Sequence, residues 1–269
     1  MMRRLLIHPG FHKTGTSSAQ HLLWHNRPVL KAHVAIFQLR HLAEPARIAM
    51  AVSRTGDTLR LADMAEALEA VFADLPRRPT RHVLLTCEGL SGHLPGWPGV
   101  NDYGAAPAIL AYLAGWLSDR FPAHRPEILL TTRGAQAWLG SAWRHHLLGQ
   151  RLTQDWPDFA RRLGPAADLS AAARAIAEAV APIPVRTRDL GKIAGLPLGP
   201  GQALLDPLGL PEEVLARLEP VGHGNPGPSP ELAAELLALN RSGLDDSSLS
   251  AKKAELARAA GVGGWVRAR

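Results

Sequence analysis

The segment LLIHPGFHKTGTSSAQ, residues 5–20, carries the residue types of an anion-binding loop. An apolar run leads into Gly10, Lys13 and Gly15, and a helical pattern follows at once. The first N–H groups of a helix have no main-chain partner, and they carry the positive end of the helix dipole. A strand, a glycine turn and a helix N-terminus together therefore predict a site for a phosphate or a similar anion.

The position of the lysine separates this loop from the GxxxxGK[ST] loop of nucleoside triphosphate-binding proteins. In that loop the lysine follows the second glycine and reaches the outer phosphates, while the next hydroxyl holds magnesium. Here Gly10 and Gly15 have the same spacing, but Thr16 and Ser17 follow Gly15 and the lysine lies at position 13. A lysine inside the loop lies among main-chain amides, where it can neutralise a leaving phosphate.

The stretch HKTGTSSAQ resembles the phosphosulfate-binding loop of sulfotransferases that use 3′-phosphoadenosine 5′-phosphosulfate (PAPS), in particular the bacterial members of that family. The resemblance implies a P-loop-like fold and a magnesium-independent transfer of a sulfuryl group, so we expect no metal. It assigns Lys13 to the leaving 5′-phosphate and its bridging oxygen. It also implies that the same phosphate receives amides and hydroxyls from Thr14, Gly15, Thr16, Ser17 and Ser18.

A second segment, EILLTTRGAQAWLGSAWRHHL, resembles the part of these enzymes that binds the 3′-phosphate. An apolar strand ends at Arg133, and Ser141 lies eight positions later, slightly over two turns along a helix. By the resemblance, Arg133 and Ser141 clamp the 3′-phosphate of PAPS, with a cationic fork and a hydroxyl donor. In an open parallel sheet both motifs lie at carboxyl ends of strands, so one nucleotide could bridge them.

Three residues are candidates for the base that removes the proton of the sulfuryl acceptor. Glu88 closes the strand HVLLTCE and precedes GLSG, which resembles a segment of the bacterial relatives in which a glutamate faces the acceptor. We place Glu88 first, although such a residue can also assist a helix N-cap or bind a metal. His12 in the loop and His93 follow, because imidazole titrates near neutral pH.

The elements around these residues alternate between strand and helix. Short apolar runs without polar alternation end near residues 8, 37, 88, 133 and 187, which is typical of parallel strands covered on both faces. Helical patterns occupy residues 16–26, 57–75, 104–120, 134–149 and 168–180, and Asp57 and Asp168 are candidate N-caps. We expect a three-layer α/β/α fold with a central, mostly parallel sheet of about five strands.

The rest of the chain favours a single domain over residues 1–269. Pro and Gly concentrate between residues 191 and 230, which predicts an irregular segment and makes it a candidate lid. Residues 229–269 return to helix, with a proline in one first turn and a glycine after the last helix. VGHGNPGPSP resembles the Asn-x-Ser region before the C-terminal helices of the family, but its glycines and prolines stretch that pattern around Asn225.

Composition limits the location and the partners. The net charge is +6 with a pI near 10.1, yet no dense Lys/Arg run with interleaved aromatic residues occurs, so we expect no nucleic-acid partner. No apolar stretch is long enough for a signal peptide or a membrane span, and the single cysteine, Cys87, suits a reducing compartment. A cytoplasmic location is the simplest prediction.

The functional hypothesis from the sequence is a PAPS-dependent sulfotransferase that acts on a hydroxyl or amine of a small molecule or glycan. Two alternatives stay open. A non-catalytic nucleotide-binding protein could keep the fold without the chemistry, and retained Lys13 argues against it. A magnesium-dependent nucleotide kinase would need a lysine after Gly15 and an aspartate that closes a strand, and the sequence has neither.

Overall fold

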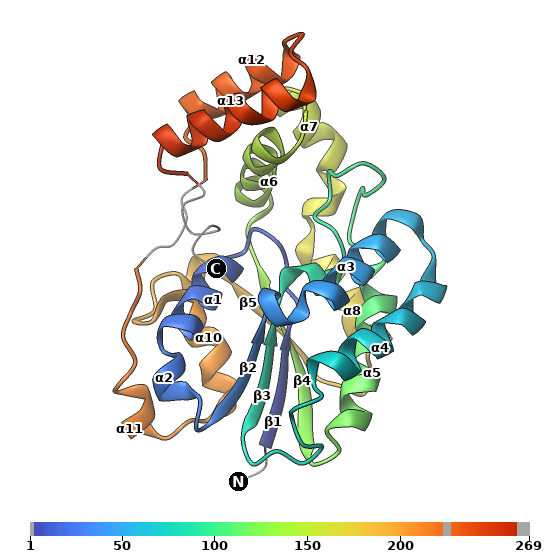
Figure 1. Cartoon of the computed structure of the whole chain (residues 1–269), viewed down its shortest axis with the longest axis vertical. Coiled ribbons are helices and arrows are strands. Elements are labelled where there is room, and N and C mark those ends of the chain that lie inside the picture. Colours follow the sequence, from blue (N-terminus) through green and yellow to red (C-terminus); the bar gives the residue numbers. More distant parts are fainter. Residues whose placement is uncertain (1–2, 223–226, 263–269) are drawn as a thin grey trace.

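The computed structural model describes residues 3–222 and 227–262. Five strands form one sheet in the order β2-β3-β1-β4-β5, and every neighbouring pair is parallel (Figure 1). The strands are β1 (Arg3–His8), β2 (Val34–Gln38), β3 (His82–Thr86), β4 (His124–Thr132) and β5 (Val185–Asp189). This confirms the predicted α/β class with a central sheet of five strands.

Alternate residues of each strand enter two separate hydrophobic cores. Leu5 and Ile7 of β1 face the larger core, whereas Leu6 between them faces the smaller one. The larger core is covered by α3 (Leu39–Thr55), α4 (Leu61–Val71), α5 (Ala106–Arg120) and α8 (Leu169–Ala179). The smaller core is covered by α1 (Thr16–His25), α2 (Arg27–Leu30), α10 (Gln202–Leu205) and α11 (Glu212–Leu215). Figure 1 shows these two helical layers on either side of the sheet.

Most of the elements follow the residue ranges predicted from the sequence. Asp168 caps α8 through a hydrogen bond from Ala171 N, and Asp57 caps a 3₁₀ turn, Thr58–Arg60, that leads into α4. The sequence analysis missed α3, the longest helix of the described chain, and α7 (Trp156–Leu163). Pro45 lies inside α3 and is buried, and a proline inside a helical pattern argues against a helix when only sequence is considered.

The segment predicted to be irregular, residues 191–230, is described up to residue 222 and from 227. Its described part contains short helical turns: the end of α9 (Leu190–Ile193), Gly199–Gly201, α10, Asp206–Leu208 and α11. Leu204, Leu205 and Leu208 are fully or almost fully buried and pack in the smaller core with Leu22 and Leu84. These turns therefore cover one face of the sheet. Asn225 lies outside the described residues.

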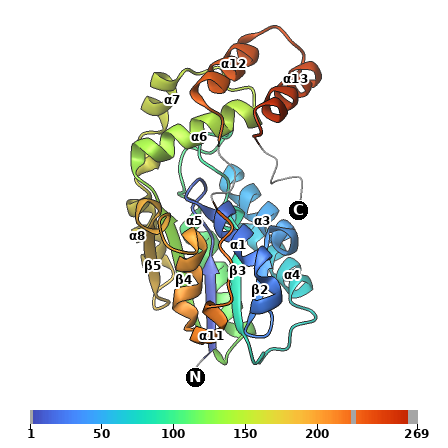
Figure 2. The same cartoon turned by 90° about the vertical axis from the view of Figure 1, so that its left-hand side faces the viewer.

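A helical group lies beyond the carboxyl ends of the strands. It contains α6 (Ala135–Gly149), α7, α12 (Pro230–Arg241) and α13 (Asp246–Ala259), at the top of Figure 1 and again in the turned view of Figure 2. Ser229 caps α12 by accepting from Leu232 N, as the proline in its first turn suggests, and Gly261 follows α13 with φ 66°. The last residues of the predicted helical tail, 263–269, lie outside the described chain.

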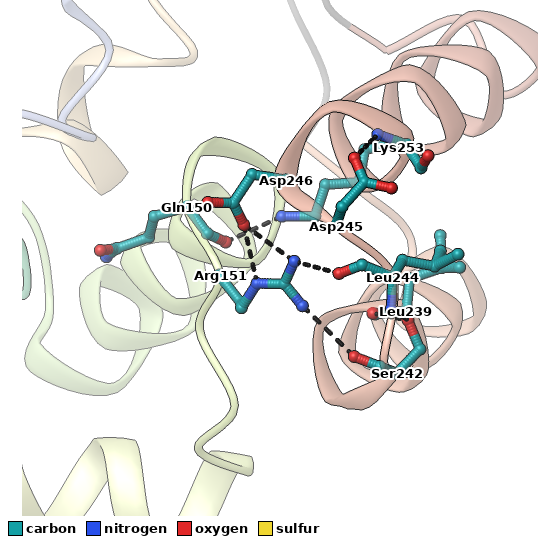
Figure 3. A network of polar contacts seen from close by, with 9 residues as sticks. Gln150, Arg151, Leu239, Ser242, Leu244, Asp245, Asp246 and Lys253 are labelled. Atoms are coloured by element: carbon teal, nitrogen blue, oxygen red, sulfur yellow. Dashed lines mark hydrogen bonds and ion pairs between the residues drawn. The ribbon is translucent and has the colours of Figure 1, made fainter.

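Helices α12 and α13 form a C-terminal hairpin, and polar contacts hold it to the end of α6 (Figure 3). Lys253 is buried and donates from Nζ to the Gln150 main-chain oxygen at 2.8 Å. Arg151 binds Asp246 at 2.8 Å and donates to the main-chain oxygens of Ser242 and Leu244. None of the helices in the described ranges has both the length and the hydropathy needed to cross a bilayer.

Candidate functional site

The three central strands carry the predicted site residues to one edge of the sheet. The loop with Lys13 follows β1, Glu88 follows β3 in a 3₁₀ turn (Glu88–Ser91), and Arg133 follows β4. Because β1 lies between β3 and β4, and all three strands are parallel, these residues gather at adjacent carboxyl ends. Arg133 reaches the loop directly, since its Nη1 donates to the Lys13 main-chain oxygen at 3.1 Å.

The main chain of the loop is held by its carbonyl groups. Five consecutive carbonyl oxygens, of residues 9 to 13, each accept a hydrogen bond from a side chain. The donors, in order, are Ser91 at 2.5 Å, Thr131 at 3.3 Å, Thr14 at 2.5 Å, Trp138 at 2.9 Å and Arg133 at 3.1 Å. The loop is therefore fixed before any ligand binds, with its carbonyl oxygens occupied by protein donors.

The N–H groups of the same loop have few protein partners. Across the described residues, the main-chain N–H groups of Lys13, Gly15 and Thr16 donate to no protein acceptor. Helix α1, which starts at Thr16, has no side-chain cap and no acidic residue in its first turn. These donors, at the positive end of a helix, form a preorganised anion site.

Positive φ angles give the loop its shape. Gly10 has φ 119°, Lys13 has φ 64° and Gly15 has φ 92°. A Cβ at Gly15 would meet the Leu190 side chain at 2.7 Å and Pro200 at 3.3 Å, so only glycine fits here. The second glycine of the motif is thus required by its backbone and by the chain that packs against it.

The site collects three cationic groups and one carboxylate, Glu88, and no ion pair joins them among the described residues. Within the described chain, Lys13, Arg133 and Arg144 have no ion-pair partner. Burial lowers the pKa of Lys13 from its usual value; Glu88 opposes this shift, and the charges of Arg133 and Arg144 add to it. Burial and the Arg144 charge also lower the pKa of Arg133. The three cations repel one another, and an anionic ligand would relieve that repulsion.

Glu88 is positioned by two glutamines. The Gln20 side chain donates from Nε2 to Glu88 Oε2 at 2.9 Å and also contacts the Thr86 main-chain oxygen. Gln38, at the end of β2, donates in turn to the Gln20 main-chain oxygen at 2.7 Å. A buried glutamine thus fixes the carboxylate beside Lys13, a role that the sequence analysis did not assign to Gln20.

His12 contributes to the site through its main chain and has a neutral side chain. Its oxygen accepts from the Trp138 indole, and its Nδ1 lies 3.2 Å from the Tyr103 hydroxyl. Burial, followed by the charges of His93 and Lys13, lowers the pKa of His12 to about 3. The imidazole is therefore uncharged at neutral pH. His93 is half-buried, and its ring is tilted against that of Trp97 with 4.9 Å between the ring centroids.

The threonines of the loop use their hydroxyls inside the protein. Thr14 Oγ1 lies 2.6 Å from Thr131 Oγ1, and Thr16 Oγ1 donates to the Phe11 main-chain oxygen at 3.2 Å. Both residues are buried and both hydroxyls are bonded within the protein, so these side chains do not offer a free hydroxyl to a ligand. Ser17 is exposed and Ser18 is half-buried, and both lie in the first turn of α1.

Helix α6 brings the second motif over the loop. Trp138, Ser141 and His145 follow one another at spacings of three and four, so they share one side of the helix. The Trp138 end of that side contacts the loop, because the Trp138 indole donates to the His12 main-chain oxygen. Ser141 lies between Trp138 and His145 and is half-buried.

Sequence reasoning missed several contributors to this site. Trp138 packs in the larger core, and its indole nitrogen also anchors the loop. Arg144 was not singled out, although its side chain adds the third unpaired cation. The available signal was its place three residues after Ser141 on the same helix. Among the described residues, no group of three or more His, Cys, Asp or Glu side chains is arranged to hold a metal ion.

Comparison with known proteins adds no family assignment. No protein-family model matches the chain, and a search of curated proteins finds no match.

Proposed function

We propose that this protein is a sulfotransferase that binds PAPS at the carboxyl ends of β1, β3 and β4 and transfers its sulfuryl group to a hydroxyl or amine. The observation that carries the proposal is the meeting of Lys13 and Arg133, two cations without carboxylate partners in the described chain, at one loop. A ligand with two separated anionic groups fits this arrangement. The loop and the Arg133–Ser141 segment both resemble parts of sulfotransferases that bind PAPS.

The residues present fit the two ends of such a donor. Lys13 and the main-chain N–H groups of Gly15 and Thr16 would hold the 5′-phosphosulfate, and Arg133 with Ser141 would hold the 3′-phosphate. Arg144, close enough to lower the pKa of both Lys13 and Arg133, would add positive charge between them. PAPS would supply an activated sulfuryl group on a phosphate leaving group.

The chemistry assigns one task to Glu88 and another to Lys13. Glu88, held by Gln20 at 2.9 Å, would accept the proton of the attacking hydroxyl as its oxygen bonds to sulfur. The bond from sulfur to the bridging oxygen breaks, and its electron pair stays on the leaving phosphate. Lys13 would balance the charge that develops there. Because side chains and main-chain amides provide this positive charge, no metal is required by the scheme.

Ligand-dependent thermal unfolding tests the proposal. Adenosine 3′,5′-bisphosphate should raise the melting temperature in the presence of EDTA, because a ligand that binds only the native state stabilises it by mass action. Saturating bisphosphate at 100 times its Kd should add about 2.7 kcal/mol of stability. No shift with the bisphosphate, together with a magnesium-dependent shift with ATP, would replace this proposal with a nucleotide kinase.

Acceptor screening separates the enzyme from a non-catalytic relative. The protein should transfer label from ³⁵S-labelled PAPS to some member of a panel of phenols, amines and glycans. Bisphosphate binding without transfer to any acceptor in the panel, and without slow hydrolysis of PAPS, would favour the non-catalytic alternative.

A further inference from the structure

A cavity lies at the edge of the sheet opposite the loop, where the strands begin. It has a volume of about 330 Å³, and its wall comes from the start of β1, the chain before β2 and β3, and the turn before α11. This edge is at the bottom of Figure 1, far from α6 and the loop. The volume is at the lower end of the range of small-molecule pockets, so the cavity suits a compact ligand.

The polar groups of this cavity are donors. Arg3, His33, His82 and Thr80 line it together with the apolar side chains of Leu210 and Pro211, and no acidic residue of the described chain does so. The neighbouring Arg4 has a partner, since it lies 3.6 Å from Glu127, which also binds Arg186 at 2.8 Å. Arg3 has no such carboxylate in the described chain. A cation is therefore left facing the cavity.

His82 adds a donor whose direction is fixed. Its side chain is 3% exposed, and its Nδ1 accepts the Arg4 main-chain N–H at 3.0 Å. The proton of the neutral ring is therefore on Nε2, for which the described chain offers no acceptor. Burial and the charges of Arg3 and His124 lower the pKa of His82 to about 4, so the ring stays neutral at pH 7. Because His82 lines the cavity, this N–H is available to a ligand acceptor there.

We infer that this cavity is a binding site for a small phosphate monoester, separate from the loop at the other edge. The Arg3 guanidinium would bind two phosphate oxygens, and His82 Nε2–H would donate to a third. Thr80 and His33 would complete the contacts at the rim, and Leu210 and Pro211 would pack against the carbon part of the ligand. The inference is independent of the proposed sulfuryl transfer.

NMR of the histidine ring signals tests this inference, with inorganic phosphate as the first probe and glycerol 3-phosphate as the second. The His82 signals are identified by their loss in His82→Asn, in which the amide oxygen can replace Nδ1 as acceptor for Arg4 N–H. In the native protein these signals should shift and saturate on titration. They should do so equally in a Lys13→Met variant. That variant weakens anion binding at the loop, so an unchanged His82 response shows that the phosphate binds elsewhere.

A matched pair of arginine variants decides the result. Arg3→Gln should raise the Kd for phosphate, measured from the His82 shifts, at least about tenfold, because a charged hydrogen-bond donor is lost. Arg125→Gln removes the same charge at the same edge of the sheet from an exposed residue that does not line the cavity, and should leave the response unchanged. The inference is overturned if His82 shows no saturable shift, or if both arginine variants weaken it equally.

Discussion

Two regions of this molecule place cationic side chains beside main-chain carbonyls, and they differ in what surrounds the charge. Where α6 meets the C-terminal hairpin, Arg151 binds Asp246 and two main-chain oxygens, and Lys253 donates to the Gln150 oxygen (Figure 3). In the loop, Arg133 has one main-chain oxygen, and Lys13 has no ion-pair partner in the described chain.

The difference separates a structural cation from one that the protein leaves available to a ligand. Both lysines have a pKa below the usual value because burial disfavours the charge, so the lowered pKa alone does not distinguish them. The partners do. A cation whose donors are used by the protein holds two elements together, whereas a desolvated cation beside other cations raises the energy of the unliganded protein. That energy is recovered when an anion binds.

The largest effect is expected for Lys13→Met. The substitution keeps an unbranched side chain, so the cost of the left-handed backbone at position 13 does not change, and it removes the charge. Sulfuryl transfer should fall about 10²- to 10³-fold, the usual cost of losing one group that stabilises a developing anion. Stability without ligand should stay equal or rise, which denaturation in urea would measure. Lys31→Met, at an exposed lysine, is the control.

Glu88→Gln distinguishes removal of the acceptor proton from binding of the nucleotide within the same site. Glutamine keeps the shape of the side chain and removes its basicity, so transfer should fall while the melting-temperature shift with adenosine 3′,5′-bisphosphate is retained. If this variant transfers at the full rate, another residue removes the acceptor proton, and the role assigned to Glu88 is wrong.

The structural lysine should show the reverse pattern. Lys253→Met removes the charged hydrogen bond to the Gln150 oxygen, which keeps the Leu152 N–H as its other donor, and should cost about 1–3 kcal/mol in the free energy of unfolding. Bisphosphate affinity should change less than about twofold, because distant sites act nearly independently. The neighbouring Lys252 is exposed, and Lys252→Met should stay within about 0.5 kcal/mol of the native protein. Equal losses from both variants would remove the distinction between the regions.

The smallest expected effect is a pH dependence of ligand affinity at alkaline pH. Burial, with Arg133 and Arg144, lowers the pKa of Lys13, and the ligand binds the charged form. Affinity for the bisphosphate should therefore be constant near neutral pH and fall as the pH rises through the lowered pKa, before free lysine would titrate. Calorimetry in buffers of different ionisation enthalpy should detect proton uptake on binding in that range. Lys13→Met should lack both effects.

The fold was predictable from the sequence where single elements carried their own signal. Five apolar runs without polar alternation gave the parallel strands, and Asp57 and Asp168 marked helical starts correctly. Helix α3 escaped because Pro45 argues locally against a helix, while packing of Ala46, Ala49 and Val52 in the larger core decides in its favour. Tertiary burial outweighs local propensity there.

The site was predictable to the extent that it lies in short motifs. Lys13, Glu88 and Arg133 follow adjacent strands, so the predicted strand ends were sufficient to bring them to one edge. The contact between Gln20 and Glu88, and that between Trp138 and the loop, join residues far apart in sequence whose types suit a core equally well. Only the packing of α1 against β3, and of α6 over the loop, distinguishes the two roles.

The close fit of Gly15 against Leu190 and Pro200 ties two distant parts of the chain to one outcome. The segment after β5 packs against the loop at Gly15. A bulkier or differently shaped turn at residues 190–200 would therefore move the main-chain N–H groups of the loop without contacting any ligand. Attempts to change ligand preference by random mutagenesis should therefore yield altered clones in this turn as well as in the motif itself.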